Sequence, residues 1–293
     1  MKKYYFLLLC LALIIITGCC SGNTFVIKEI NLELVKCPAG SFMMGSPKNE
    51  LGRPRDGDRE GYYISEILHL VSISKPFYIG KYEITQSQYS AIMERNPSEF
   101  VAPNNPVERV SWEDAKEFIN KLNLKYLSLV PQGYRFDLPT EAQWEYACRA
   151  GTNTAFNNGK NLSNDEYDKP CSNLDEVAWY QCNASGTTHA VGQKKPNPWG
   201  IYDMHGNVAE WCKDYLDAYS SKDAIDPLVE KNSDCPNFHI FRGGASTNKK
   251  SEIHSIDYKS NCRSAKRFFP NEINNPILRE SCIGIRVALV PIN

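Results

Sequence analysis

The sequence has almost no net charge: 33 Lys and Arg residues balance 34 Asp and Glu residues, and only 5 His residues are present. This balance argues against a general nucleic-acid-binding surface. No Pro-, Ser- or Gly-rich linker, low-complexity tract or repeat of solenoid or propeller spacing divides the chain. Beyond the N-terminal region, no apolar run is long enough to cross a membrane. Because 18 Gly and 17 Pro residues are spread along the chain, we expect one loop-rich globular domain.

The N-terminal region has the pattern of an export signal. Two lysines precede an apolar run at residues 4–16, which is too short for a membrane span of about 20 residues, and small residues precede Cys19. This pattern predicts a lipoprotein signal peptide at residues 1–18, with Cys19 as the acylated first residue; an ordinary signal peptide or a short anchor helix is the alternative. Residues 19–33 would form a tether. We expect a protein anchored by lipid to a membrane of the bacterial cell envelope, on the periplasmic face or the cell surface.

The sequence contains 11 cysteines. Cys10 would leave with the signal peptide and Cys19 would carry lipid. In an oxidising compartment the remaining set favours disulfides, and since no C-x-x-C pair is present, the spacing does not support a zinc site. The remaining number is odd, so at least one thiol stays unpaired within the chain, and Cys20 is the first candidate. Cys171 and Cys182 could close a local loop, although spacing alone establishes no pairing.

Hydrophobic patterning and capping residues predict short strands and capped helices. Residues 34–46 indicate a strand, a turn and a second strand, and alternating apolar residues predict further strands at 68–74 and 77–84. Residues 47–61 are charged and contain glycines, which is typical of a surface loop. Helices are expected after three cap residues, two of them in capping boxes: Thr85, Ser111 and Thr140.

Residues 198–211 combine aromatic side chains, two glycines and two carboxylates seven positions apart. The glycines disfavour a long helix, and the pattern is no clean strand alternation. Buried irregular backbone needs partners for its polar groups, and a hard cation with oxygen ligands is one solution. The side chains of Asp203 and Glu210 and the carbonyls of Gly206 and Val208 form the candidate metal site. A glycine-containing turn with solvated carboxylates is the alternative.

A series of motifs then resembles one known family, the formylglycine-generating enzymes, also called the sulfatase-modifying factor domain. The resemblance covers residues 34–291. It implies a single α+β domain with little regular secondary structure, related to the C-type lectin fold. The motifs occur in the family's order: Cys37–Ser46, Tyr82–Gln86, Pro106–Trp112, Leu138–Ala147, the stretch at 198–211, Phe241–Gly244 and Ile283–Ala288.

The resemblance also implies a chemistry, which this sequence does not complete. The family's enzymes oxidise a substrate cysteine with molecular oxygen and a copper ion held by two cysteines, and soft thiolates suit Cu(I). Counting forward from the Gly-Gly motif places Asn248 and Ile253 at those two positions; counting backward from residues 264–267 places His254 and Lys259 there. None is a cysteine. We therefore expect no copper site and no formylglycine generation by the family mechanism.

Other expectations come from the resemblance alone. The family often joins a cysteine of the helix that contains Trp144 to a later cysteine, which here implies a Cys148–Cys262 disulfide. The family also binds structural calcium through the segment that contains the candidate metal site. The same four residues therefore become a predicted Ca²⁺ site.

These expectations favour a non-catalytic protein that binds a protein or another envelope ligand, or that helps assembly, since function depends on the site rather than the fold. Polar residues at 245–261 and 268–279 suit a binding surface; solvated loops are the alternative. Other functions left open are an oxygen-dependent oxidoreductase and a structural part of a secretion or motility complex. The candidate ligand-binding face comprises Asn248, His254, Tyr258, Lys259, Arg263 and Arg267.

Overall fold

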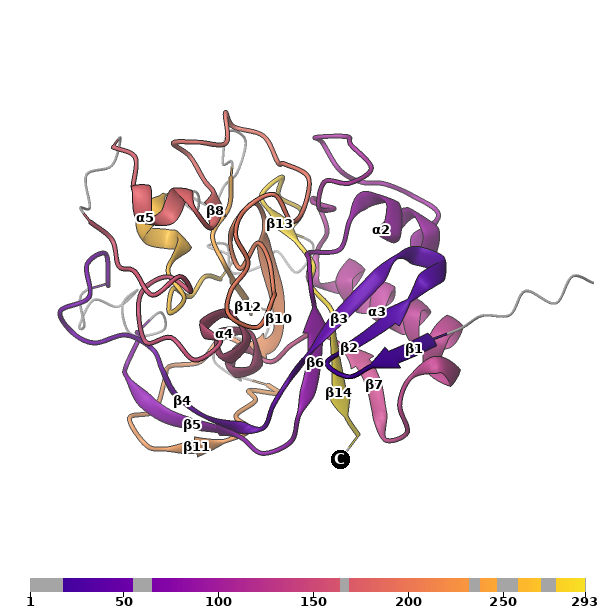
Figure 1. The fold of residues 1–293 in the computed structure, drawn as a ribbon, viewed down its shortest axis with the longest axis horizontal. Helices are drawn as coiled ribbons and strands as arrows, with labels where there is room; N and C mark the ends of the chain where they lie inside the picture. Colours follow the sequence, from indigo (N-terminus) through magenta and orange to yellow (C-terminus); the bar gives the residue numbers. More distant parts are fainter. Residues whose placement is uncertain are drawn as a thin grey trace, which may run out of the picture.

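Within its described residues, the computed structural model contains four β-sheets and several short helices (Figure 1). This mixed composition confirms the predicted α+β class. The residues described are 18–54, 65–163, 169–231, 238–246, 258–269 and 278–292. The helices are α2 (Gln86–Met93), α3 (Trp112–Tyr126), α4 (Glu141–Arg149) and α5 (Ser172–Asp175), with 3-10 turns η1 (Lys28–Ile30), η2 (Leu127–Leu129) and η3 (Lys259–Cys262).

The largest sheet has six strands in the order β1-β2-β3-β6-β14-β7. This sheet contains strands from both ends of the described chain. The first strand, β1, lies at one edge, and the last strand, β14, lies between β6 and β7. Strand β2 pairs with both β1 and β3, so most of residues 19–33, for which the sequence predicted a tether, lie in this sheet instead. The strands of this sheet are β1 (Gly18–Ser21), β2 (Thr24–Ile27), β3 (Leu32–Cys37), β6 (Phe77–Gly80), β7 (Tyr134–Asp137) and β14 (Ala288–Pro291).

Both faces of this sheet are covered by helices. Alternate strand residues point to opposite faces, so Leu34 packs in one hydrophobic cluster with α2 and α3, whereas Val35 packs in a second cluster with α4. Figure 1 shows α2 and α3 on one side of the sheet and α4 on the other. The sheet therefore forms the wall between two cores. One face of α3, formed by Ala115, Phe118, Ile119 and Leu122, packs in the first core.

The three predicted N-caps are confirmed. Thr85, Ser111 and Thr140 each accept a hydrogen bond from the backbone of the residue three positions later, whose side chain bonds back to the cap. These reciprocal bonds satisfy two backbone donors that a helix start leaves open. No helix in the described ranges is long and apolar enough to cross a membrane.

Three smaller sheets lie beside α4 and hold the irregular part of the chain. Strand β10 is the longest strand of these sheets, and it pairs with β12 and β13. Strand β5 pairs with β4 and β11, and β8 pairs with β9. Their bounds are β4 (Gly40–Met44), β5 (His69–Ile73), β8 (Ala178–Trp179), β9 (His205–Gly206), β10 (Ala209–Tyr215), β11 (Ala224–Ile225), β12 (His239–Arg242) and β13 (Ile283–Gly284).

Candidate functional site

The turn at Gly243 and Gly244 leads from β12 to the region in which the sequence places the ligand-binding face. Both residues have positive φ angles, 102° and 73°, which favour glycine. A Cβ on Gly244 would lie 2.7 Å from the Cys262 Sγ atom. The two predicted ligand residues Asn248 and His254 lie outside the described residues. The turn is therefore fixed on one side by close packing that only glycine allows.

Arg242, at the end of β12, is fully buried beneath this turn. Its guanidinium forms an ion pair with the Glu145 carboxylate of α4. It also donates to the carbonyl oxygens of Ser264 (3.0 Å), Ala265 (2.8 Å) and Lys266 (2.8 Å). One side chain therefore holds the irregular segment at 264–266 against α4.

Arg263 is also fully buried, contrary to its predicted place on a ligand-binding face. Its Nη1 and Nη2 atoms lie 2.7 and 2.8 Å from the two carboxylate oxygens of Glu66, and Nη1 lies 2.7 Å from Glu50. Burial alone would lower the pKa of Arg263, but Glu66 and Glu50 raise it. The Arg263 side chain therefore forms an internal ion pair and does not face an external ligand.

Arg267 and Lys259 show the same departure from the prediction. Arg267 is 1% exposed and donates through Nε (2.7 Å) and Nη2 (2.9 Å) to the Glu141 carboxylate. Lys259 is 3% exposed, and its Nζ atom lies 3.0 Å from the carbonyl of Lys169. Of the four described members of the predicted face, only Tyr258 is partly exposed. The predicted face is therefore wrong for these two residues and for Arg263.

The stretch at 198–211 forms a network of bonds at its turns. Asp203, Gly206 and Asn207 all have positive φ, and a Cβ on Gly206 would meet the Trp179 carbonyl oxygen at 2.0 Å. The Asn207 amide donates to Glu83 (2.7 Å), as does the Val208 backbone N–H (3.0 Å). Side chains thus satisfy buried irregular backbone here, as the polar groups require.

These bonds do not fit the predicted calcium site. Glu210 accepts three hydrogen bonds from the buried Arg286 guanidinium at 2.7–2.9 Å, and a further one from Trp144 Nε1 at 2.6 Å. Asp203 accepts from the Gly192 backbone N–H at 2.6 Å. In the described part of the chain, no group of three or more His, Cys, Asp or Glu side chains could hold a metal ion. An internal cation, Arg286, balances the Glu210 charge.

The predicted Cys148–Cys262 disulfide is not formed. Cys148 is a thiol, 3.5 Å from the Ser264 hydroxyl and 3.8 Å from His205 Nε2. The His205 Nδ1 atom lies 2.6 Å from the Cys262 carbonyl oxygen, so sequence analysis did identify two neighbouring segments. Cys171 is likewise a buried thiol, and the possible Cys171–Cys182 bond is absent too.

Burial makes the Cys148 thiol and the His205 imidazole poor reactive groups. It raises the pKa of Cys148 to about 12 and lowers the pKa of His205 to about 4. The His205 Nε2 atom accepts from the Asn157 backbone N–H at 3.0 Å, so the ring is neutral with its proton on Nδ1. A thiol without thiolate character is inert. The pair is a packing feature.

A model of the sulfatase-modifying factor enzyme 1-like domain matches residues 27–290. This match spans most of the chain. The protein belongs to the sulfatase-modifying factor enzyme 1-like family. The expected family resemblance is confirmed, and the matched range starts seven residues before the predicted start at residue 34.

Relatives of this family member include proteins with different names. It is 34% identical over 259 residues to the chaperone protein LppX of Paenibacillus barcinonensis, covering 72% of this chain and 81% of LppX. It is 30% identical over 132 residues to the formylglycine-generating enzyme of Streptomyces coelicolor, covering 43% of this chain and 38% of that enzyme.

Two solved structures share the fold over almost their whole length. Treponema denticola variable protein 1 has a TM-score of 0.69 at 27% identity, with 92% of this chain and 98% of that chain covered. PvdO from Pseudomonas aeruginosa has a TM-score of 0.68 at 26% identity, with the same two coverages. The domain therefore occurs under names that do not refer to formylglycine.

Sequence analysis missed the buried cations and their acidic partners. Arg242, Arg286 and Glu83 were placed in family motifs without a role. One signal was available: each arginine follows or lies within an otherwise apolar strand segment. A charge in such a segment must be paired when it is buried.

Proposed function

We propose that this family member is a lipid-anchored protein of the bacterial cell envelope that binds or assembles an exported protein and does not oxidise cysteine. One observation carries the proposal: no cysteine lies between Gly243 and Cys262, where the family's copper-binding pair is expected. Cu(I) prefers soft ligands such as thiolates. The name of the LppX relative, a chaperone protein, supports a protein-binding role.

Three buried thiols of the domain do not replace the missing pair. Burial raises the pKa values of Cys37, Cys148 and Cys212, all fully buried, well above the usual thiol range. A copper ligand or a mixed disulfide with substrate needs a thiolate. Lys259, one of the residues at the equivalent positions, is buried and bonded to backbone. The donor set therefore does not fit a copper oxidase.

The test is an anaerobic Cu(I) titration of the mature domain, followed by aerobic incubation with a cysteine-containing sulfatase peptide and mass spectrometry. The Streptomyces coelicolor formylglycine-generating enzyme, treated identically, is the positive control. We expect no tight copper binding and an unchanged peptide thiol. Stoichiometric copper uptake together with conversion of the peptide cysteine would restore the oxidase and end the non-catalytic proposal.

The anchor requires a separate test, because it depends on Cys19 and not on the domain. Replacing Cys19 with Ser should abolish incorporation of a labelled fatty acid and move the protein from the membrane fraction to the soluble fraction, since acyl chains provide the membrane affinity. Cys20→Ser is the matched control and should remain labelled and membrane-bound. Equal labelling of the wild-type protein and Cys19→Ser would contradict the anchor.

A further inference from the structure

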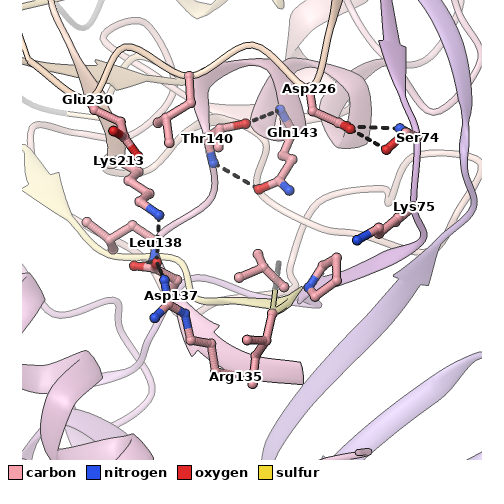
Figure 2. Close-up of a pocket in the computed structure, with 14 residues that line it drawn as sticks. Ser74, Lys75, Arg135, Asp137, Leu138, Thr140, Gln143, Lys213, Asp226 and Glu230 are labelled. Atoms are coloured by element: carbon pink, nitrogen blue, oxygen red, sulfur yellow. Dashed lines mark hydrogen bonds and ion pairs between the residues drawn. The ribbon is translucent and has the colours of Figure 1, made fainter. Parts of the chain in front are cut away.

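A cavity of about 330 Å3 lies where the six-stranded sheet meets the small sheet of β4, β5 and β11. The connection after β5 contributes Ser74 and Lys75, β7 contributes Arg135 and Asp137, and the segment 226–230 follows β11. Figure 2 shows these side chains around one opening, with the Lys75 ammonium group directed into it. The volume is at the lower end of the range typical of ligand pockets.

We propose that this cavity binds an extended peptide segment that carries an acidic side chain next to an apolar one. The inference rests on the proposed protein-binding function and names the chemistry of the partner. The acidic group would lie between Lys75 and Arg135. The apolar group would lie on the wall of the cavity formed by Leu138, Leu228 and Val290.

Two other lysines balance the charge of Asp137, so this carboxylate does not neutralise Lys75 or Arg135. Its carboxylate lies 2.9 Å from Lys116 Nζ and 3.0 Å from Lys213 Nζ, and it accepts from the Leu138 backbone N–H at 2.9 Å. Burial raises the pKa of Asp137, but the two ammonium groups outweigh this effect and lower it below its usual value. Asp137 is therefore ionised, and its carboxylate oxygens already have ion-pair and hydrogen-bond partners.

Lys75 and Arg135 remain without a strong partner. The shortest ion-pair distance of Arg135 is 3.6 Å to Asp137 Oδ2, its side chain is 52% exposed, and no hydrogen bond joins the two groups. Lys75 forms no ion pair with any described residue. The cavity mouth thus carries two cations whose charge is open to a ligand. Arginine in particular favours a carboxylate, which it can bind through two parallel hydrogen bonds.

Two further acidic residues line the cavity, and one of them, Glu230, gives the ligand a direction. Asp226 is held by Ser74, whose backbone N–H lies 2.9 Å from Oδ1 and whose hydroxyl donates to Oδ2. Glu230 forms no ion pair within the described ranges, and Figure 2 places it beyond Lys213, on the far side of the opening from Lys75. A backbone N–H of the peptide suits that end, whereas a second carboxylate there would be repelled.

The binding test uses isothermal titration calorimetry at millimolar peptide with two blocked pentapeptides, Gly-Leu-Asp-Leu-Gly and Gly-Leu-Lys-Leu-Gly. Succinate serves as a free dicarboxylate. We expect saturable binding of the Asp peptide alone, weakened when NaCl is raised from about 0.05 M to about 0.5 M, because salt screens exposed charges. Equal binding of the Asp and Lys peptides, or of the Asp peptide and succinate, would overturn the inference. So would no binding of either peptide.

The double variant Lys75→Glu/Arg135→Glu should weaken binding of the Asp peptide by about tenfold or more, since both exposed cations are replaced by repelling charges. The double variant Lys28→Glu/Lys48→Glu changes the net charge by the same amount at two exposed residues outside the cavity, and as the matched control it should bind as the wild-type protein does. Both variants should unfold at the wild-type temperature. An unchanged affinity in the folded double variant would locate the peptide elsewhere.

The outcome for the cavity can be separated from the outcome for the proposed function. If the double variant loses the Asp peptide yet the domain also oxidises the sulfatase peptide, the cavity stands and the non-catalytic proposal fails. If the domain lacks copper chemistry and binds neither peptide, the non-catalytic proposal stands and the cavity inference fails.

Discussion

The interior beneath the Gly243–Gly244 turn and the cavity between the two sheets contain the same kinds of charged residues in opposite situations. In the interior, Arg263 is completely buried and contacts two carboxylates at 2.7 Å. At the cavity, Arg135 is half exposed, with one carboxylate at 3.6 Å. Desolvation makes the first charge costly unless it is paired. The exposed Arg135 charge costs little free energy without a close partner. An arginine therefore stabilises the fold in the interior and is available for binding at the cavity.

The comparison predicts its largest effect at Arg263. Replacing Arg263 with Met leaves the Glu66 carboxylate buried without its cation, and removal of one partner from a buried pair costs about 3–5 kcal/mol. Urea denaturation should show this loss in the free energy of unfolding. The double variant Arg263→Met/Glu66→Gln should recover part of it, because the buried Glu66 charge is removed and only Glu50 still lacks its cation. A single variant within about 1 kcal/mol of the wild-type protein would show that the interior does not depend on this pair.

A pH titration tests the carboxylates of the two regions. Asp214 is a buried residue of β10 whose carboxylate accepts from the Glu141 backbone N–H at 2.7 Å, beside the Arg267–Glu141 pair of the interior. Burial, with the Glu141 charge nearby, raises the pKa of Asp214 to about 7. The folded protein therefore holds a proton that the unfolded chain releases near pH 4. Between about pH 4 and 7 this group should lower the free energy of unfolding as pH rises, by at most about 1.4 kcal/mol per pH unit.

Asp214→Asn should remove that slope, as measured by urea denaturation at several pH values. The control is Asp137→Asn, at the cavity. The pKa of Asp137 is lowered in the folded protein, so the group is charged in both states above about pH 5, and its stabilising effect is lost only at lower pH. The control should keep the wild-type slope between about pH 5 and 7. Equal slopes in both variants would contradict the difference between the regions.

Whether an interaction could be predicted from the sequence depends on how far apart its residues lie along the chain. The caps at Thr85, Ser111 and Thr140 involve partners three positions away, so local pattern identified them. The ion pairs of the interior join residues far apart: Arg267 and Glu141 are separated by 126 positions, and Arg263 and Glu50 by 213. No local pattern contains that information. Polar composition alone therefore placed Arg263 and Arg267 on a surface.

The same limit applied to the predicted metal site. The glycines at 198–211 correctly indicated irregular backbone before strand β10, which contains Glu210. The spacing of Asp203 and Glu210 did not show that Arg286, 76 positions beyond Glu210, would be their neighbour. The family resemblance supplied the fold because many motifs occur in order along the chain. It could not supply the site, because a site depends on which few residues meet in space.

The smallest effect is expected at Arg135, and it separates the two regions most directly. Arg135→Met should change the free energy of unfolding by about 0.5 kcal/mol or less, because a weak exposed ion pair contributes little. Chemical denaturation of Arg135→Met and Arg263→Met under the same conditions compares their free energies of unfolding directly. If Arg135→Met destabilised the fold as strongly as Arg263→Met, its charge would be structural after all, and the cavity would lose one of its two open cations. A neutral result leaves that guanidinium available for a carboxylate ligand.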